Sequence, residues 1–188
     1  MMTSTGKPAS RAGRTAPLPE PAGKLHHPGG PVLSTGVEEH IVVSAPPAKV
    51  FAAVADVRRM ARWSPECFAV WIWRKQNGMP SRFIGWNRYK LFVWFSACQV
   101  RVAEPDAEFA FDVTTFGMPV ARWGYRFSPT QGGTEVTEYW FDKRNFGSTL
   151  LGRIFTGKSA TMRPEVNRDG MRQTLRRLKT ELESAAKS

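Results

Sequence analysis

Apolar side chains recur every three or four residues along the last part of the chain, from Pro164 to Ala185, and this spacing predicts a long amphipathic helix. On its polar face, Arg177–Glu181 and Lys179–Glu183 are predicted as ion pairs, because residues four apart are neighbours on a helix surface. The expected buried stripe consists of Asn167, Gly170, Met171, Thr174, Leu175, Leu178 and Leu182. Several of these residues are polar or small, so the helix is expected to leave space beside the layer that it covers.

Alternation of apolar and polar residues dominates the middle of the chain and predicts β-strands joined by tight turns. Asn77-Gly78 is a strong hairpin signal, and Pro46-Pro47 suits the first turn of a helix. The predicted strands are 37–44, 68–75, 81–90, 91–103, 108–115, 120–128 and 134–143, and the predicted short helices are 46–57 and 58–63. The expected fold class is therefore α+β, with a curved seven-stranded antiparallel sheet wrapped around the C-terminal helix and two short helices after strand one.

Large aromatic rings gather on one face of this predicted sheet. Trp123 and Tyr125 share a face, as do Glu138 and Trp140, because every second residue of a strand points the same way. A curved sheet that carries so many rings against a helix is expected to enclose a cavity. The candidate ligand-binding residues are Trp86, Asn87, Trp94, Phe111, Trp123, Tyr125, Trp140, Asn167, Met171 and Leu175. Each can equally be a plain core residue, but as a set they favour a bulky, flat or long apolar ligand.

Composition separates the first 36 residues from the rest. Residues 1–36 are rich in Pro and Gly, basic and poor in large apolar side chains, so we expect a disordered tail there and one domain over 37–188. The net charge of +11 is concentrated at the end of the chain, where residues 143–188 carry +7. This basic end could meet an anionic membrane transiently, or it could be a solvated helix face. No specific nucleic-acid partner is expected, since no basic run is interleaved with exposed aromatic residues.

The connection before the last helix, 145–157, carries a second apolar cluster that contains Leu150, Leu151, Ile154 and Phe155. It could close the cavity as a lid or touch a membrane, or it could simply pack on the sheet edge.

Few residues are available for metal or nucleophile chemistry. Cys67 and Cys98 show no metal-binding spacing and are expected to be reduced and buried. His40 is the single histidine after the tail, and it is most simply an ordinary strand residue. We therefore expect neither a metal nor a cofactor. With no apolar run of 18 or more residues and no signal peptide, the chain is expected to be soluble and cytoplasmic.

Five segments together resemble the START-like (SRPBCC) superfamily, in its polyketide cyclase/dehydrase branch. These segments are APPAKVFAAVADVRRMARWSP, RFIGWNRY, ACQVRVAEPDAEFAFDV, ARWGYRF and GGTEVTEYW. The resemblance covers residues 37–185 and implies a helix-grip fold with a deep hydrophobic tunnel. Members of this superfamily include aromatic-ring cyclases and carriers of lipids and hormones. No catalytic motif of the family transfers to this sequence residue by residue.

Glu138 and Tyr125 are the candidate catalytic residues. A glutamate buried among tryptophans would have a raised pKa and could exchange protons near neutral pH. The alternative is that Glu138 pairs with Arg88 or Arg126 in a network on the sheet surface.

Three functions remain open at this stage. The first is binding of a hydrophobic small molecule, such as a polyketide, a lipid or an isoprenoid-like compound, by a monomer or homodimer. The second is a cyclase or aromatase activity that folds its substrate in the cavity and assists enolisation. The third is a basic surface that binds an anionic membrane or RNA through Arg153, Lys158, Arg168, Arg172 and Arg176.

Overall fold

The computed structural model describes residues 36–144 and 163–185 of the 188-residue chain. The tail predicted over 1–36 lies outside the described residues except for Gly36, with which the first strand begins. The connecting segment 145–157, with its apolar cluster, also lies outside them. The described residues belong to one compact unit, Leu33–Ser188.

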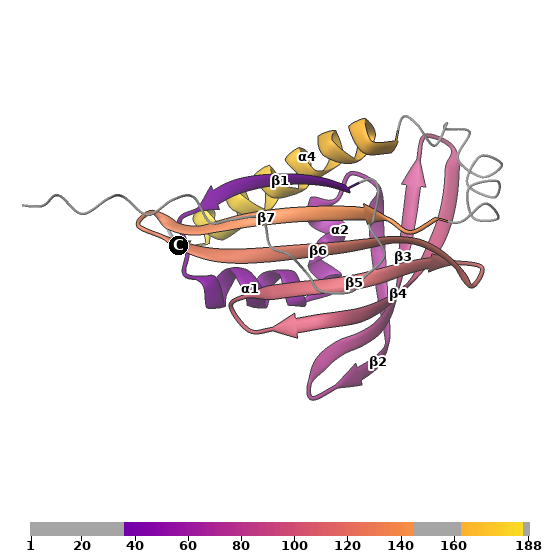
Figure 1. Cartoon of the computed structure of the whole chain (residues 1–188), viewed down its shortest axis with the longest axis horizontal. Coiled ribbons are helices and arrows are strands. Elements are labelled where there is room, and N and C mark those ends of the chain that lie inside the picture. The colour runs from indigo at the N-terminus through magenta and orange to yellow at the C-terminus, as the bar shows by residue number, and fades with distance from the viewer. Residues whose placement is uncertain (1–35, 145–162, 186–188) are drawn as a thin grey trace, which may run out of the picture. The chain divides into compact units, whose positions relative to one another are not determined.

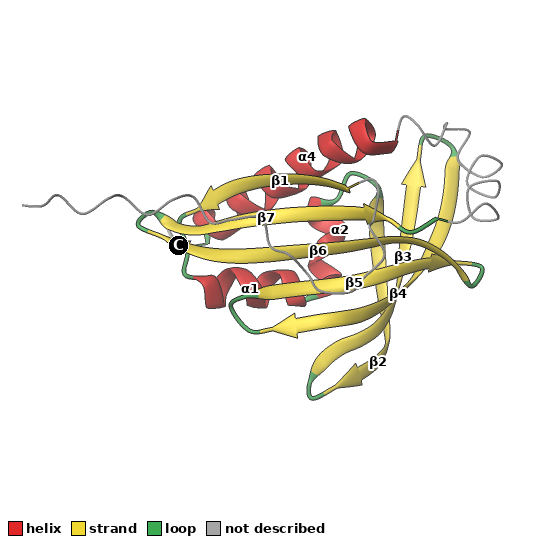
Figure 2. Ribbon diagram, viewed as in Figure 1, coloured by secondary structure: helices red, strands yellow, loops and turns green. Residues whose placement is uncertain are grey.

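Seven antiparallel strands form one sheet in the order β1-β7-β6-β5-β4-β3-β2 (Figure 1). The strands are β1 (Gly36–Val43), β2 (Cys67–Gln76), β3 (Met79–Tyr89), β4 (Phe92–Glu104), β5 (Glu108–Thr115), β6 (Met118–Thr130) and β7 (Gly133–Asp142). The helices are α1 (Pro47–Ala55), α2 (Met60–Trp63) and α4 (Arg163–Ser184), with a 3-10 turn, η1 (Val57–Arg59), between the first two. The predicted fold is confirmed: Figure 2 shows the long curved sheet, two short helices that follow β1, and the terminal helix.

Tight turns join β2 to β7 as a meander. Asn77 and Gly78, which connect β2 to β3, have φ angles of 50° and 78°. Positive φ at both central positions is the geometry of the hairpin turn that Asn-Gly favours, so the local sequence accounts for this connection. Among the described strands, consecutive hairpins leave β1 and β2 at the two edges of the sheet.

The hydrophobic core lies between the concave face of the sheet and the helices. Phe51 of α1 packs edge-to-face on Phe109 and Phe127, with ring centroids 6.5 and 5.9 Å away. Leu175 and Leu178 of α4 join the same buried cluster. None of the helices in the described ranges is long and apolar enough to cross a bilayer.

One carboxylate ties the end of α4 to the short helices. Glu181 accepts hydrogen bonds from Arg59 at 2.6 Å and from the indole of Trp63 at 2.6 Å. The predicted Arg177–Glu181 ion pair is therefore wrong: Arg177 instead donates to the Trp63 carbonyl, because tertiary partners outcompete the neighbour one turn away. The predicted Lys179–Glu183 pair is confirmed, with 3.1 Å between Lys179 Nζ and Glu183 Oε1.

Candidate functional site

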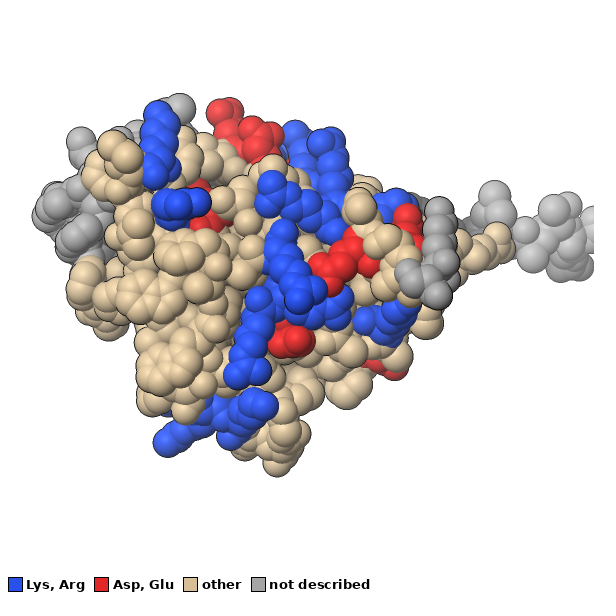
Figure 3. Space-filling view, turned by 180° about the vertical axis from the view of Figure 1, so that it is seen from behind, with Lys and Arg blue, Asp and Glu red and all other residues tan. Residues whose placement is uncertain are grey.

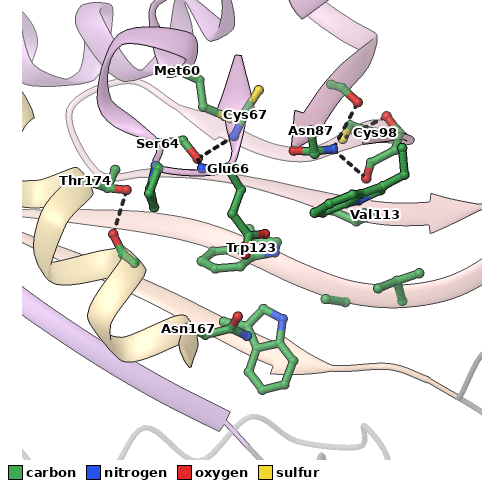
Figure 4. A pocket seen from close by; sticks show the side chains of 18 of the residues that line it. Met60, Ser64, Glu66, Cys67, Asn87, Cys98, Val113, Trp123, Asn167 and Thr174 are labelled. Carbon is green, nitrogen blue, oxygen red and sulfur yellow. Dashed lines mark hydrogen bonds between the residues drawn. The ribbon is translucent and has the colours of Figure 1, made fainter. Parts of the chain in front are cut away.

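A cavity of about 630 Å³ lies between the concave face of the sheet, α2 and the first half of α4. Its existence follows from the sequence of α4. Asn167, Gly170 and Thr174 face it. These residues are small or short, so they leave space open, whereas the second half of the helix presents leucines that fill the core. Figure 4 shows Asn167 and Thr174 on the helix side, Asn87 and Cys98 on the sheet side, and the Trp123 ring between them.

A buried tyrosine–glutamate pair forms part of the cavity wall. Tyr125 on β6 and Glu138 on β7 are direct cross-strand neighbours, so their side chains leave the sheet on the same face. The Tyr125 hydroxyl donates to Glu138 Oε1 at 2.9 Å. Glu138 is only 2% exposed, and its other oxygen, Oε2, is buried and has no hydrogen-bond partner among the described residues. A buried carboxyl oxygen without a partner is energetically costly, so this oxygen is a candidate contact for a polar group in the cavity.

Burial controls the protonation of this pair. It raises the pKa of Glu138 from an ordinary 4.5 to about 8, although the hydrogen bond from Tyr125 lowers it in part. Burial and the neighbouring Glu138 also raise the pKa of the Tyr125 hydroxyl well above 10. At neutral pH the carboxyl is therefore mostly protonated. With Oε1 accepting from Tyr125, Oε2 carries a hydrogen that it can donate to a molecule in the cavity.

The alternative expectation, an arginine partner for Glu138, is wrong. Arg126 follows Tyr125 directly in β6, so its side chain lies on the opposite face of the sheet, where it pairs with Glu38. Arg88 lies over the ring of Phe68, with its guanidinium carbon 5.9 Å from the ring centroid.

A second polar group lies on β3 and β4. The Asn87 carboxamide donates to Ser96 Oγ and to the Gly85 carbonyl, both at 3.1 Å. Cys67 and Cys98 lie beside it and are buried, as predicted. Burial raises the pKa of the Cys67 thiol to about 11 and that of Cys98 further still. Both thiols stay protonated near neutral pH, so neither is an activated nucleophile.

Most of the candidate ligand-binding residues do line the cavity. They are Asn87, Trp94, Phe111, Trp123, Tyr125, Trp140, Asn167 and Met171, and Glu138 lies with them. The two exceptions are Trp86 and Leu175. Trp86 is adjacent to Asn87 in one strand, and alternation prevents both from facing the cavity: Trp86 is 41% exposed and packs on Phe95, at 6.0 Å between ring centroids. Leu175 faces the buried core beneath α4.

Several lining residues were not predicted. Ser64, Pro65 and Glu66 come from the loop after α2, and Arg144, held by Asp142, follows β7. No periodic pattern marks loop residues, so the sequence carried no signal for them. Val93 and Phe116 also line the cavity although they are 57% and 59% exposed, which shows that it reaches the surface between the start of β4 and the β5–β6 turn.

The part of the chain that the structure describes contains no set of side chains suited to bind a metal ion. No group of three or more His, Cys, Asp or Glu side chains comes close enough together to hold an ion. Among the same residues, His40 is exposed on β1; it pairs with Thr137, so its side chain lies on the opposite face of the sheet from Glu138.

The family described as polyketide cyclase / dehydrase and lipid transport matches residues 34–183. A START superfamily protein from Mycobacterium smegmatis has a TM-score of 0.65 and 13% identity, over 80% of this chain and 98% of that chain. A Polyketide_cyc-like protein from Corynebacterium glutamicum has a TM-score of 0.54 and 29% identity, over 80% of this chain and 93% of that chain. The di-domain ARO/CYC protein BexL has a TM-score of 0.62 and 19% identity, over 81% of this chain and 51% of BexL. No curated protein shows a significant match.

Proposed function

The chain belongs to the polyketide cyclase/dehydrase and lipid transport family, and from this premise we propose that its cavity binds an apolar small molecule that carries a hydrogen-bond acceptor such as a carbonyl. Polyketides, fatty-acid-like compounds and isoprenoid-like compounds that bear a carbonyl all fit this description. The proposal combines the apolar wall, which sets the size and shape of the ligand, with one buried donor that sets its orientation.

The observation that carries the proposal is the unpartnered Oε2 of Glu138. The carboxyl is held in place by Tyr125 and is mostly protonated at physiological pH, so it offers a hydrogen-bond donor to the cavity without the cost of a buried charge. A ligand carbonyl at Oε2 would satisfy this donor. Pockets that are mainly apolar with a few fixed polar groups are typical of small-molecule sites.

The walls favour a flat or elongated ligand. Trp123 and Trp140 lie with ring centroids 6.5 Å apart on neighbouring strands, and Phe111 lies on the next strand. Rings of this kind provide contact area at little cost in conformational entropy. The cavity volume of about 630 Å³ lies in the range of small-molecule sites.

A matched pair of fluorescent dyes tests the role of the donor. We would use an acylnaphthalene dye that carries one ketone and the parent naphthalene dye without it, each titrated into the wild type, Glu138→Gln and Glu138→Leu. The ketone dye should bind the wild type and the Gln variant alike at pH 6.5, because Gln keeps a donor. It should bind the Leu variant about tenfold or more weakly, since an unpaired polar group costs about 1–3 kcal/mol. The parent dye should bind all three proteins equally.

The pH dependence of binding gives a second readout. Above pH 8 the wild-type carboxyl loses its proton, so the affinity for the ketone dye should fall by up to about tenfold per pH unit. The Gln variant should show no such decline. Ketone-dye affinity that is insensitive to both the variant and the pH would contradict the role of Glu138, and failure of both dyes to bind would contradict a ligand cavity.

A second candidate function is a cyclase-like enzyme, and the near-neutral pKa of Glu138 beside Tyr125 favours it. A carboxyl that titrates near pH 8 could exchange a proton with an enolisable carbonyl chain. Native mass spectrometry of protein purified from its own host, with identification of the bound compound, would show whether such a chain is present. Under the enzyme hypothesis Glu138→Gln abolishes turnover and preserves affinity. Equal loss of both would indicate a structural glutamate.

A further inference from the structure

Large apolar side chains are exposed on the outer face of β2 and β3 and at the β3–β4 turn with the first residues of β4, and no described element covers them. We call this surface the aromatic patch. Its members, with their exposed fractions, are Phe68 (49%), Trp71 (61%), Trp73 (49%), Trp86 (41%), Leu91 (96%), Phe92 (51%) and Val93 (57%). Contiguous apolar surface of this kind marks an interaction site on a water-soluble domain.

The segment that carries the patch is also the most one-sidedly charged part of the sheet. Residues 67–103 contain no Asp or Glu. Their six basic residues are Arg74, Lys75, Arg82, Arg88, Lys90 and Arg101. Two of them lie over patch rings: the guanidinium carbons of Arg82 and Arg88 are 5.6 Å and 5.9 Å from the ring centroids of Trp73 and Phe68. Figure 3 shows a broad area without charged side chains, bordered by Lys and Arg.

We propose that the aromatic patch and its bordering cations form a docking surface for an anionic lipid bilayer. Tryptophan is the residue that membrane interfaces favour, because its ring is amphipathic, and Lys and Arg near the surface bind anionic headgroups. Leu91, in the turn between β3 and β4, and Phe92, the first residue of β4, are both exposed and provide the side chains that insert among the acyl chains.

The position of the patch supports a lipid surface over other partners. Val93 belongs both to the patch and to the cavity wall, so the surface that meets the bilayer is continuous with the opening of the cavity. A second copy of the chain would bring two uniformly basic segments together, which like-charge repulsion disfavours. A single-stranded nucleic acid could stack its bases on the tryptophans, but such stacking would not bury the exposed aliphatic side chains of Leu91 and Val93.

This location differs from the one that the sequence suggested. Arg172 on α4 is partly neutralised, since it pairs with Glu39 at 3.0 Å and with Asp169 at 3.5 Å. The exposed face of α4 also carries no large apolar side chain among its described residues. Arg153 and Lys158 lie outside the described residues. The β2–β4 surface combines charge and apolar area, whereas α4 offers charge alone.

Vesicle cosedimentation tests the proposal with the full chain. The vesicles are phosphatidylcholine with and without phosphatidylglycerol, at low and high salt. The apolar arm is the double variant Leu91→Ser/Phe92→Ser, whose residues are exposed and absent from the cavity wall. The charge arm is Arg74→Glu/Lys75→Glu, and its matched control, with the same change in charge, is Arg168→Glu/Arg176→Glu on α4.

The wild type should bind the anionic vesicles, and less tightly at high salt. The apolar variant should lose up to about a hundredfold in partitioning, because each of the two inserted large apolar side chains contributes about tenfold. The β2 charge variant should lose about 25-fold or more, since each of the two surface cations contributes about fivefold and the new carboxylates add repulsion. The α4 control should stay within about twofold of the wild type.

Four results would overturn the proposal. They are the absence of vesicle binding, equal loss in the α4 control, tight binding of a single-stranded RNA instead of vesicles, and a dimer in sedimentation equilibrium that Leu91→Ser/Phe92→Ser dissociates. The dye titrations described for the cavity are independent of vesicles. A protein that binds dye and ignores vesicles therefore retains the proposed function and loses only the membrane surface.

Discussion

Replacing Glu138 by Gln should remove a specific dependence of stability on pH. In the folded protein the pKa of Glu138 is about 8, against 4.5 for an ordinary glutamate. Between these two values the folded state keeps the proton and the unfolded state releases it. The folded state therefore binds more protons, and the free energy of unfolding of the wild type must fall as the pH rises through this window.

The size of the effect follows from the two pKa values. Each pH unit within the window costs the wild type up to about 1.4 kcal/mol, which adds up to about 3 to 4 kcal/mol between pH 5 and pH 8. This is a large part of the free energy of unfolding of a typical domain, which is about 5–15 kcal/mol. Gln does not titrate, so the variant should gain that amount relative to the wild type over the same range, whatever its stability at pH 5.

Urea unfolding of both proteins at pH 5, 6, 7 and 8, monitored by tryptophan fluorescence, measures the difference directly. Groups common to both proteins cancel in it. A difference that stays constant from pH 5 to pH 8 would show that Glu138 is ionised in the folded protein, and the argument for a neutral donor would fail. Tyr125→Phe provides a second test, because this variant should raise the pKa of Glu138 further. Its hydroxyl lowers the pKa of Glu138, so without it the loss of stability should extend to higher pH.

Two further predictions concern packing away from the cavity. At Gly124 an added Cβ atom would lie 2.2 Å from Tyr139 Cζ, so Gly124→Ala must displace that ring. We expect this variant to lower the free energy of unfolding in urea by about 1–3 kcal/mol. The control is Gly132→Ala, where the nearest atom is 3.9 Å away and the change should stay within about 0.5 kcal/mol. Equal effects at the two glycines would refute this. Thr134 is fully buried and its hydroxyl donates to the Ala45 carbonyl at 2.7 Å, so Thr134→Val should lower the unfolding free energy by about 1–3 kcal/mol. An unchanged urea midpoint would show that this bond contributes nothing.

Local patterns in the sequence were enough to predict the elements and the general position of the site. The turn at Asn77-Gly78 and the period of two in the strands depend on neighbours in the chain, so they are visible in the sequence. The same alternation correctly placed Tyr125 and Glu138 among residues of the ring-bearing face. It also contained the reason why Trp86 could not share a wall with Asn87, although the predicted wall included both.

Only the tertiary structure decided which groups meet across the sheet. The β6–β7 register gives Glu138 a tyrosine partner and leaves Oε2 without one. A break in the β4–β5 register between Val100 and Val102 puts these two residues on opposite faces, contrary to simple alternation. Register and bulges are set by contacts between strands, which no single strand encodes.

The fate of the tryptophans shows the same division. The sequence determined that the chain has an aromatic-rich sheet, and each ring could have been core, cavity wall or surface. The structure buries Trp140 at the cavity and leaves Trp71 61% exposed on the outer face of β2. The physical reason is that the described helices all pack on the concave face, so rings on the outer face of the β2 edge have no layer to cover them. Hydrophobicity is a property of a residue, but burial depends on which other element lies against it.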